Sequence, residues 1–196
     1  MIWWVKSRRL KLLGVAVGIN ALLIAVLGGA VVPTIGLRLS SASIAGVAII
    51  PILVNCTIQL IREKVDWQLE RSAVRNIRLL DLELLGLLVL TIVACAAVAR
   101  AAGDHLAAEG ARNAVGYLGL GLVVSRLAGG RVGAVAPAFY IFLLALFATP
   151  TSAQRSVLSW PLHSGDSHQA LTAALLLFIG GLTAVAAGAS KPVTAE

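Results

Sequence analysis

Long uncharged hydrophobic runs alternate with short charged gaps along the chain, a pattern typical of helices that cross a lipid bilayer. The first two runs, residues 12–37 and 39–61, each exceed the roughly 20 residues that a transmembrane helix needs. The third run, about residues 84–99, is shorter, so its neighbours would have to help it cover the bilayer. The fifth and sixth runs cover about residues 132–148 and 169–190.

The fourth segment is the least hydrophobic of the series. Its uncharged part, residues 113–125, is too short to cross a bilayer alone, so the span must begin near Leu106. Glu109, Arg112 and Asn113 would then lie within the membrane. The sequence therefore predicts an all-α, multi-pass membrane protein with about six transmembrane helices.

Lysine and arginine concentrate in alternate gaps, and this asymmetry predicts the orientation of the spans. The cytoplasmic segments would hold Lys6, Arg8, Arg9, Lys11, Arg62, Lys64, Arg71, Arg75, Arg78, Arg126, Arg131 and Lys191. The outside would hold Arg38, Arg100, Arg112 and Arg155. Both termini are thus predicted in the cytoplasm, and residues 1–196 are predicted to form a single domain of antiparallel helices.

Three segments between or before the spans have distinct predicted roles. Residues 1–11 form an interfacial lead-in, because Trp3 and Trp4 suit the headgroup layer. Residues 62–83 are densely charged and predict a cytoplasmic amphipathic helix between spans two and three. Its apolar residues recur at helical spacing, at Val65, Leu69, Ala73, Ile77 and Leu80. Residues 149–168 contain prolines and a tryptophan and predict an external segment folded back on the outer interface.

The composition agrees with a lipid environment. Hydrophobic residues make up 59% of the chain and charged residues 13%, which leaves too little polar surface for a soluble domain of 196 residues. The mean hydropathy is +0.92. A formal charge of +7 would suggest a nucleic-acid partner in a soluble protein, but here the basic residues flank apolar runs and set the topology. We therefore expect the bilayer, and no nucleic acid, as a partner.

The residues that could carry chemistry do not form a catalytic arrangement. Residues 129–131 are only a fragment of a phosphate-binding loop, and no serine sits in a nucleophile elbow. His163, Asp166 and His168 are close enough in sequence to suggest a metal site, but a polar external turn around Gly165 explains them more simply. Cys56 and Cys95 each lie inside an apolar run, as small buried hydrophobes do. We therefore predict no catalytic residues, metal or cofactor, and a protein that is not itself an enzyme.

Four polar residues lie within or at the ends of the predicted spans: Asn20, Asn55, Arg112 and Asn113. Such residues are costly in a membrane, so they indicate either a polar substrate pathway or hydrogen bonds that hold helices together. Glu109 and Arg112, three residues apart, could also form a local ion pair at the outer interface. The sequence leaves both alternatives open, and we take the four residues as candidate substrate-pathway residues.

The layout of spans, cytoplasmic helix, short basic turn and external segment resembles a known family. The stretch ARNAVGYLGLGLVVSRLAGGRVGAVAPAFY, followed by SWPL, is similar to the small six-helix permease subunits of type-2 ABC exporters from high-GC bacteria. This resemblance implies a subunit of the bacterial cytoplasmic membrane that exports a hydrophobic or amphipathic substrate. An ATP-binding ABC subunit would hydrolyse the ATP, and a second copy or a non-identical permease subunit would complete the complex.

The resemblance also implies which residues contact the ATP-binding subunit. Residues 66–82, within the charged segment 62–83, would be the coupling helix, and the turn at residues 126–131 would be a second, smaller contact. The partner-binding residues would be Trp67, Arg71, Arg75, Arg78, Arg126 and Arg131. Two alternatives remain, a substrate-capture subunit of an energy-coupling importer and a non-transporting membrane scaffold or assembly protein.

Overall fold

The computed structural model describes residues 10–35, 41–63, 77–147 and 157–187. Its elements, in chain order, are α2 (Leu10–Leu27), β1 (Val31–Ile35), β2 (Ser41–Ala45), α3 (Gly46–Ile49), α4 (Ile52–Glu63), α6 (Ile77–Ala101), α7 (Ala107–Ala128), α8 (Gly130–Phe147), the 3-10 helix η1 (Val157–Leu162) and α10 (His168–Ala187). The described part is predominantly helical, which confirms the predicted helical class. Its sheet structure is one antiparallel hairpin, in which β1 pairs with β2 from Val31 opposite Ala45 to Ile35 opposite Ser41.

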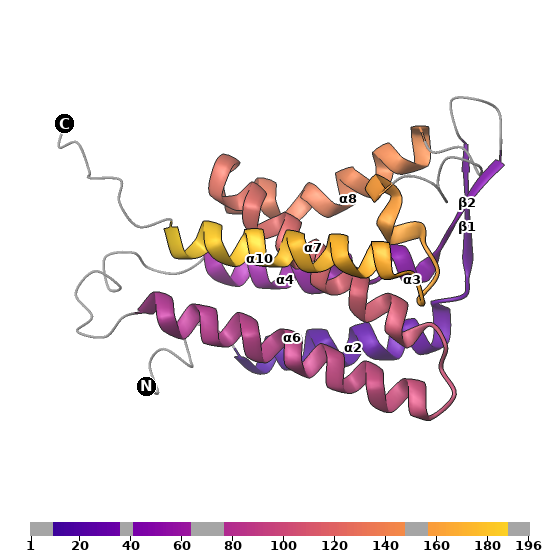
Figure 1. Cartoon of the computed structure of the whole chain (residues 1–196), viewed down its shortest axis with the longest axis horizontal. Helices are drawn as coiled ribbons and strands as arrows, with labels where there is room; N and C mark the ends of the chain where they lie inside the picture. The colour runs from indigo at the N-terminus through magenta and orange to yellow at the C-terminus, as the bar shows by residue number, and fades with distance from the viewer. Residues whose placement is uncertain (1–9, 36–40, 64–76, 148–156, 188–196) are drawn as a thin grey trace.

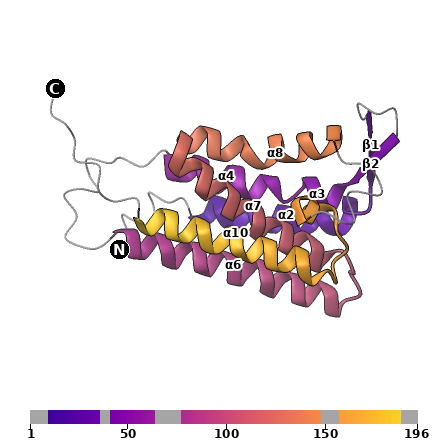
Figure 2. The same ribbon diagram turned by 45° about the horizontal axis from the view of Figure 1, so that its top comes forward.

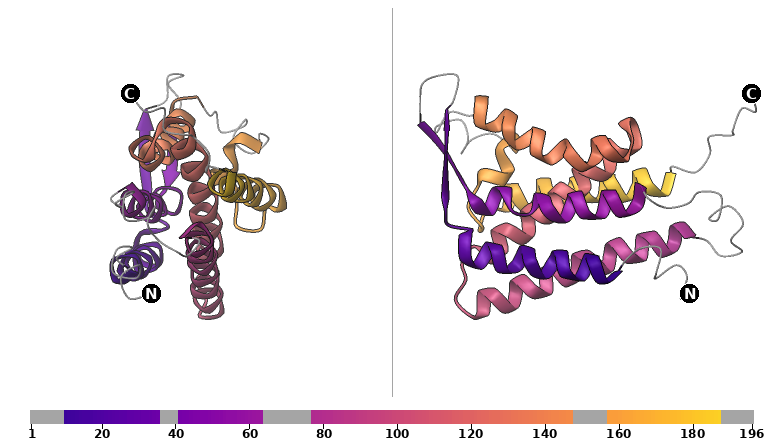
Figure 3. Two further views of the ribbon diagram at one scale, coloured as in Figure 1. Left: turned by 90° about the vertical axis from the view of Figure 1, so that its left-hand side faces the viewer. Right: turned by 180° about the vertical axis from the view of Figure 1, so that it is seen from behind.

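The long helices run side by side along the long axis of the molecule (Figure 1). The hairpin, the turn from α6 to α7 and η1 lie at one end, which we call the hairpin end (Figures 1 and 3). The end of α4, the start of α6 and the turn from α7 to α8 lie at the opposite end, which we call the turn end (Figures 1 and 3). Successive long helices therefore alternate in direction, as expected for a multi-pass bundle.

Helix α7 is the centre of the bundle. It runs obliquely between α8 on one side and α6 and α10 on the other (Figure 2). Every residue from Gly110 to Gly119 is buried. Close contact with α10 requires a glycine at position 119, because a Cβ atom there would lie 2.3 Å from the carbonyl carbon of Leu177. The least hydrophobic of the predicted spans is thus the one that the protein itself surrounds.

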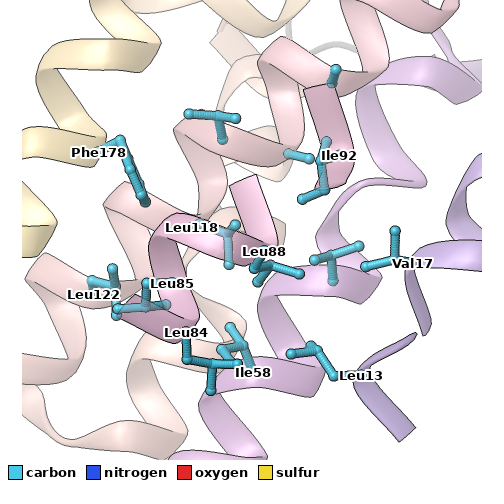
Figure 4. Close-up of a cluster of buried hydrophobic side chains, with 14 of the residues drawn as sticks. Leu13, Val17, Ile58, Leu84, Leu85, Leu88, Ile92, Leu118, Leu122 and Phe178 are labelled. Atoms are coloured by element: carbon cyan, nitrogen blue, oxygen red, sulfur yellow. The ribbon is translucent and has the colours of Figure 1, made fainter. Parts of the chain in front are cut away.

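A large apolar cluster joins α2, α4, α6 and α10 to α7 (Figure 4). It includes Leu13, Val17, Ile58, Leu84, Leu85, Leu88, Ile92, Leu118, Leu122 and Phe178. Phe178 approaches from the side opposite to Leu13 and Val17 (Figure 4). A second cluster, nearer the hairpin end, contains Tyr117, Ile141 and Trp160. Burial of such side chains stabilises a fold mainly through close packing where lipid replaces water.

Among the described residues, four helical segments are long and apolar enough to cross a membrane: Gly46–Glu63, Leu79–Ala101, Gly130–Phe147 and His168–Ala187. Lys11–Leu27 is uncharged after its first residue but shorter. Large hydrophobic side chains cover the outside of the bundle. Leu22 on α2, Leu90 on α6, Phe139 on α8 and Leu176 on α10 are each at least 60% exposed. These surfaces are the kind that proteins present to lipid.

The predicted first span, residues 12–37, was too long, because α2 ends at Leu27. Gly28 and Gly29 follow directly, and the β-branched and proline residues after them favour an extended strand over a helix. After the hairpin the backbone returns to the end of α2, where the amide of Gly46 donates to the carbonyl of Ala30 at 2.7 Å. Hydropathy alone does not distinguish such an apolar hairpin from a continuing helix.

The predicted second span, residues 39–61, is also divided. It contains strand β2, the single turn α3 and then α4. Pro51 separates α3 from α4, because proline has no amide hydrogen with which to continue the helical ladder. The helical part, Gly46–Glu63, is still long enough to count among the four candidate spans.

The helix at the predicted third span is longer than the prediction. Helix α6 has 25 residues and begins at Ile77, so the last part of the predicted cytoplasmic helix, residues 77–83, continues directly into this span. Residues 64–76 of that predicted helix lie outside the described residues, as do residues 1–9 of the lead-in.

The later helices lie within a few residues of the predicted spans, with α7 beginning at Ala107 and α8 and α10 at Gly130 and His168. Of the predicted external segment, residues 149–156 lie outside the described part. Its remainder forms η1 and a short turn before α10, and the buried Trp160 packs there against Tyr117 with ring centroids 5.3 Å apart.

Replacing Gly119 with alanine should destabilise the protein, because the added Cβ would overlap the backbone of α10. Overpacking of this kind costs about 1–3 kcal/mol, so the thermal midpoint of the detergent-solubilised protein should fall by several degrees. The matched control is Gly86→Ala on α6, where a Cβ meets nothing within 4 Å. Equal midpoints for the two variants would contradict the close contact between α7 and α10.

Candidate functional site

Arg112 lies near the start of α7 and is 4% exposed. Its Nη1 donates to the carbonyl of Ser164 and its Nη2 to the carbonyl of His163, both at 2.7 Å. These hydrogen bonds hold the turn that follows η1 against α7. A charged donor bound to carbonyl oxygens is strongly favoured in such a buried place, so the guanidinium orders the segment that precedes α10.

Asn113, the next residue, has both sides of its amide in use. Its Oδ1 accepts from Nε and Nη2 of Arg112 at 3.3 Å, and its Nδ2 donates to the carbonyls of Val47 at 3.3 Å and Pro161 at 3.1 Å. One side chain therefore connects α7 to α3 and to η1. All of these bonds go to the protein itself.

Tyr117 lies one turn further along α7 and is fully buried. Its hydroxyl donates to the carbonyl of Ala48 at 2.6 Å. Trp160 packs over the same turn, and a Cβ at Gly116 would lie 2.2 Å from its ring. We call Arg112, Asn113 and Tyr117 the α7 clamp, because together they bind carbonyl groups of α3 and of residues 161–164.

Asn55 joins α4 to α8 in the same way. Its Nδ2 donates to the carbonyls of Gly133 and Ala134 at 3.1 and 3.0 Å, and its Oδ1 accepts from Gln59 at 3.4 Å. Close approach is possible because position 121 is glycine, where a Cβ would lie 2.0 Å from Oδ1 of Asn55. For Asn55, Arg112 and Asn113 the contacts favour interhelical hydrogen bonding over a polar pathway.

Asn20 is different from the other three candidate pathway residues. It is 4% exposed, yet its Oδ1 is buried without a hydrogen-bond partner among the residues that the structure describes. It also lines a cavity between α2, α6 and α7. Of the four residues, Asn20 alone has a polar atom left for a molecule other than the described protein.

The candidate partner-binding residues belong to the turn end. Arg126 and Arg131 flank the turn from α7 to α8, and both are exposed. Nε of Arg131 lies 2.8 Å from Oε1 of Glu63 at the end of α4, so this turn is held beside the place where residues 64–76 begin. Trp67, Arg71 and Arg75 lie outside the described residues, and Arg78 lies in the first turn of α6 with its side chain outside them.

The residues considered for metal binding do not converge. Within residues 10–35, 41–63, 77–147 and 157–187, no three histidine, cysteine, aspartate or glutamate side chains come together as a metal site. Nδ1 of His163 lies 3.2 Å from Oγ of Ser167, while Asp166 pairs with Arg100 at 3.6 Å. His168 is exposed at the start of α10. This arrangement is a polar turn held by local contacts.

The sequence did not indicate that Trp160 is buried or that it packs against Tyr117. Trp160 was assigned to the outer interface, but it is 2% exposed between Tyr117 and Tyr140. The glycine at position 116 is a signal that could have indicated a bulky neighbour, although it does not identify that neighbour.

Comparison of the chain with known protein families, curated proteins and solved structures finds no match. The class therefore rests on the fold alone: the described part of the chain is helical, has four helices suited by length and composition to crossing a membrane, and is organised around a buried central helix.

Replacing Arg112 with methionine should loosen residues 159–167, because the carbonyls of His163 and Ser164 lose their charged donor. Hydrogen bonds of this kind contribute about 1.5–3 kcal/mol each. The amides of His163 and Ser167, which bond to Trp160 and Ser164, should exchange with deuterium at least about tenfold faster.

The control is Arg100→Met, which removes a cation that pairs with the same turn. Its partner Asp166 is 88% exposed and the pair is 3.6 Å long, so its loss should change exchange little. If Arg100→Met accelerated exchange as much as Arg112→Met, the clamp would not be what orders this turn.

Proposed function

We propose that this chain is the membrane-spanning permease subunit of an ABC-type transporter and that a separate subunit hydrolyses the ATP. In this proposal the chain crosses the bacterial cytoplasmic membrane six times, with both termini and the turn end in the cytoplasm. It exports a hydrophobic or amphipathic substrate together with a second copy or a non-identical permease subunit.

The observation that carries this proposal is the pairing of Glu63 with Arg131. The two segments expected to contact the ATP-binding subunit, residues 62–83 and 126–131, are far apart in sequence. The ion pair marks where the start of the first lies beside the second. A partner subunit could then contact both at one surface, with Arg126 and the largely exposed Arg131 available to it.

The dimensions of α2 and α7 support counting them as spans as well, which brings the four candidate spans to the proposed six. At 1.5 Å per residue, the 18 residues of α2 extend about 27 Å and the 22 residues of α7 about 33 Å. These lengths match the hydrocarbon thickness of a bilayer, about 30 Å. The charge of Arg112 is compatible with a span because the side chain is enclosed by protein and bound to carbonyl groups.

The proposed mechanism is alternating access. Closure of the ATP-binding partners would move the turn end, and the helices would rock between inward-open and outward-open arrangements. The α7 clamp would keep the hairpin end together during this cycle, because it binds α3 and residues 161–164 to the central helix. The chain itself needs no catalytic residue for this work.

A substrate-capture subunit of an energy-coupling importer is the second candidate. The cavity beside Asn20 favours it, because such a subunit holds its ligand within its own helices. The two candidates differ in what the chain retains when it is purified gently, either an ATP-binding subunit docked at residues 62–83 and 126–131 or a small ligand alone.

Extraction of the chain in mild detergent should recover a stoichiometric ATP-binding subunit, identified by mass spectrometry, with ATPase activity in the complex. Arg126→Glu combined with Arg131→Glu, and separately Arg71→Glu combined with Arg75→Glu, should each reduce recovery of that subunit by about tenfold or more. Charge reversal at the exposed Arg126 and Arg131 costs the fold little.

Two controls separate docking from general damage. Arg100→Glu reverses a charge at the hairpin end and should leave recovery unchanged. Glu63→Gln removes the ion pair with Arg131 while keeping the arginine, and should also retain the partner. A chain that is purified without any ATP-binding subunit would refute the permease proposal.

A further inference from the structure

A cavity opens between α2, α6 and α7 on the side of the bundle away from α8. Its empty volume is about 370 Å³, including the part that opens to the surroundings. Most of its wall is hydrocarbon, with Val17 and Ile24 on α2, Ile92 and Ala96 on α6, and Ala111 on α7. Figure 4 shows Val17 and Ile92 at the edge of the apolar core that borders this space.

Asn20 is the polar side chain of α2 in this wall. Its Oδ1 is the buried side-chain oxygen or nitrogen that lacks a hydrogen-bond partner in the described part of the chain. A buried polar atom without a partner costs free energy unless a donor reaches it, and the donors of neighbouring helices do not. Asn20 lines the cavity, so a donor that reaches its carbonyl oxygen from that side would satisfy it.

Asp104 lies at the end of the cavity, in the turn from α6 to α7. It is partly exposed, and its Oδ1 accepts from the backbone amide of Leu106 at 2.9 Å. A carboxylate at this position attracts a cation and repels an anion. Both polar groups of the cavity therefore favour a hydrogen-bond donor that is neutral or positively charged.

Water alone would find few hydrogen-bond partners in this cavity. An ordered buried water needs two to four polar partners, whereas cavities lined by apolar groups stay dry and bind apolar molecules. Besides Asn20 and Asp104, the wall offers the thiol of Cys95 and otherwise alkyl groups. A ligand that suits this cavity therefore has a hydrocarbon part to contact the alkyl walls and one hydrogen-bond donor for Asn20.

We propose that this cavity is a binding site for an amphiphile whose hydrocarbon chain lies against α2, α6 and α7 and whose neutral or cationic head group donates a hydrogen bond to Oδ1 of Asn20. An anionic amphiphile of the same length is excluded by Asp104. The site adds a ligand class to the proposed transporter, but it needs no ATP-binding partner. Its test is therefore separate from the test of the proposed function.

The probes are three twelve-carbon amphiphiles, an amine, an alcohol and a carboxylate, each with a photoreactive diazirine at the end of its chain. They are added to the purified full-length protein in lipid nanodiscs, and the labelled peptides are identified by mass spectrometry. The amine and the alcohol should label residues 17–24 and 92–99 about fivefold or more above the carboxylate.

Two variants assign the labelling to the cavity. Ala21→Phe fills the space from α2 and should reduce labelling by the amine and the alcohol to the level of the carboxylate. Ala25→Phe adds the same ring one turn later, outside the cavity wall, and should leave labelling intact. Asn20→Leu keeps the branching of the side chain at Cγ but removes the acceptor, and should lower alcohol labelling severalfold.

Equal labelling by the three probes, or labelling that survives Ala21→Phe, would overturn the proposal. Lipid analysis of the purified proteins then identifies the source of the natural amphiphile. An amine-bearing phospholipid retained by the wild-type protein and lost from Ala21→Phe indicates a bilayer lipid. Probe labelling without a retained lipid indicates a diffusible amphiphile instead.

Discussion

The hydrogen bonds between side chains of α7 and backbone carbonyls of distant segments are the interaction on which the architecture depends. Residues 46–49 and 157–164 are short, irregular pieces that expose carbonyl groups at the hairpin end. In a lipid environment such groups are tolerated only where the protein itself binds them. Arg112, Asn113 and Tyr117 supply the donors, and the helix that carries them is buried from Gly110 to Gly119.

The two ends of the bundle are held by different forces, and this difference has mechanical consequences. At the hairpin end, buried hydrogen bonds with good geometry join α7 to α3 and η1, so separation would leave polar groups unsatisfied. At the turn end, α4 and α8 are joined by the buried hydrogen bonds of Asn55 to Gly133 and Ala134 and, beyond them, by an ion pair whose arginine is 88% exposed. Exposed ion pairs contribute little, so relative movement costs least beyond Asn55, at the tip of the end proposed to meet an ATP-binding partner.

Much of the helical layout could be predicted from the sequence, and the exceptions have physical causes. The spans that correspond to α8 and α10 were placed within a few residues, because charged or proline-containing gaps bound them on both sides. The first span was wrong because valine and isoleucine are hydrophobic in a strand and in a helix alike. The roles of Asn55 and Arg112 stayed open because their acceptors lie about 50 to 80 residues away, and no single-sequence pattern records such pairs.

Asn20 and Asn55 show how geometry separates roles that the sequence leaves equivalent. Each is a lone amide in an apolar stretch and each is almost completely buried. Asn55 has carbonyl acceptors on α8 and a donor in Gln59, so both ends of its amide are hydrogen-bonded within the protein and join α4 to α8. Asn20 has a carbonyl oxygen that the described protein does not bind, beside a space lined with alkyl groups. An unsatisfied buried polar atom costs free energy, so the proposed ligand would give the oxygen of Asn20 the partner that the amide at position 55 already has within the protein.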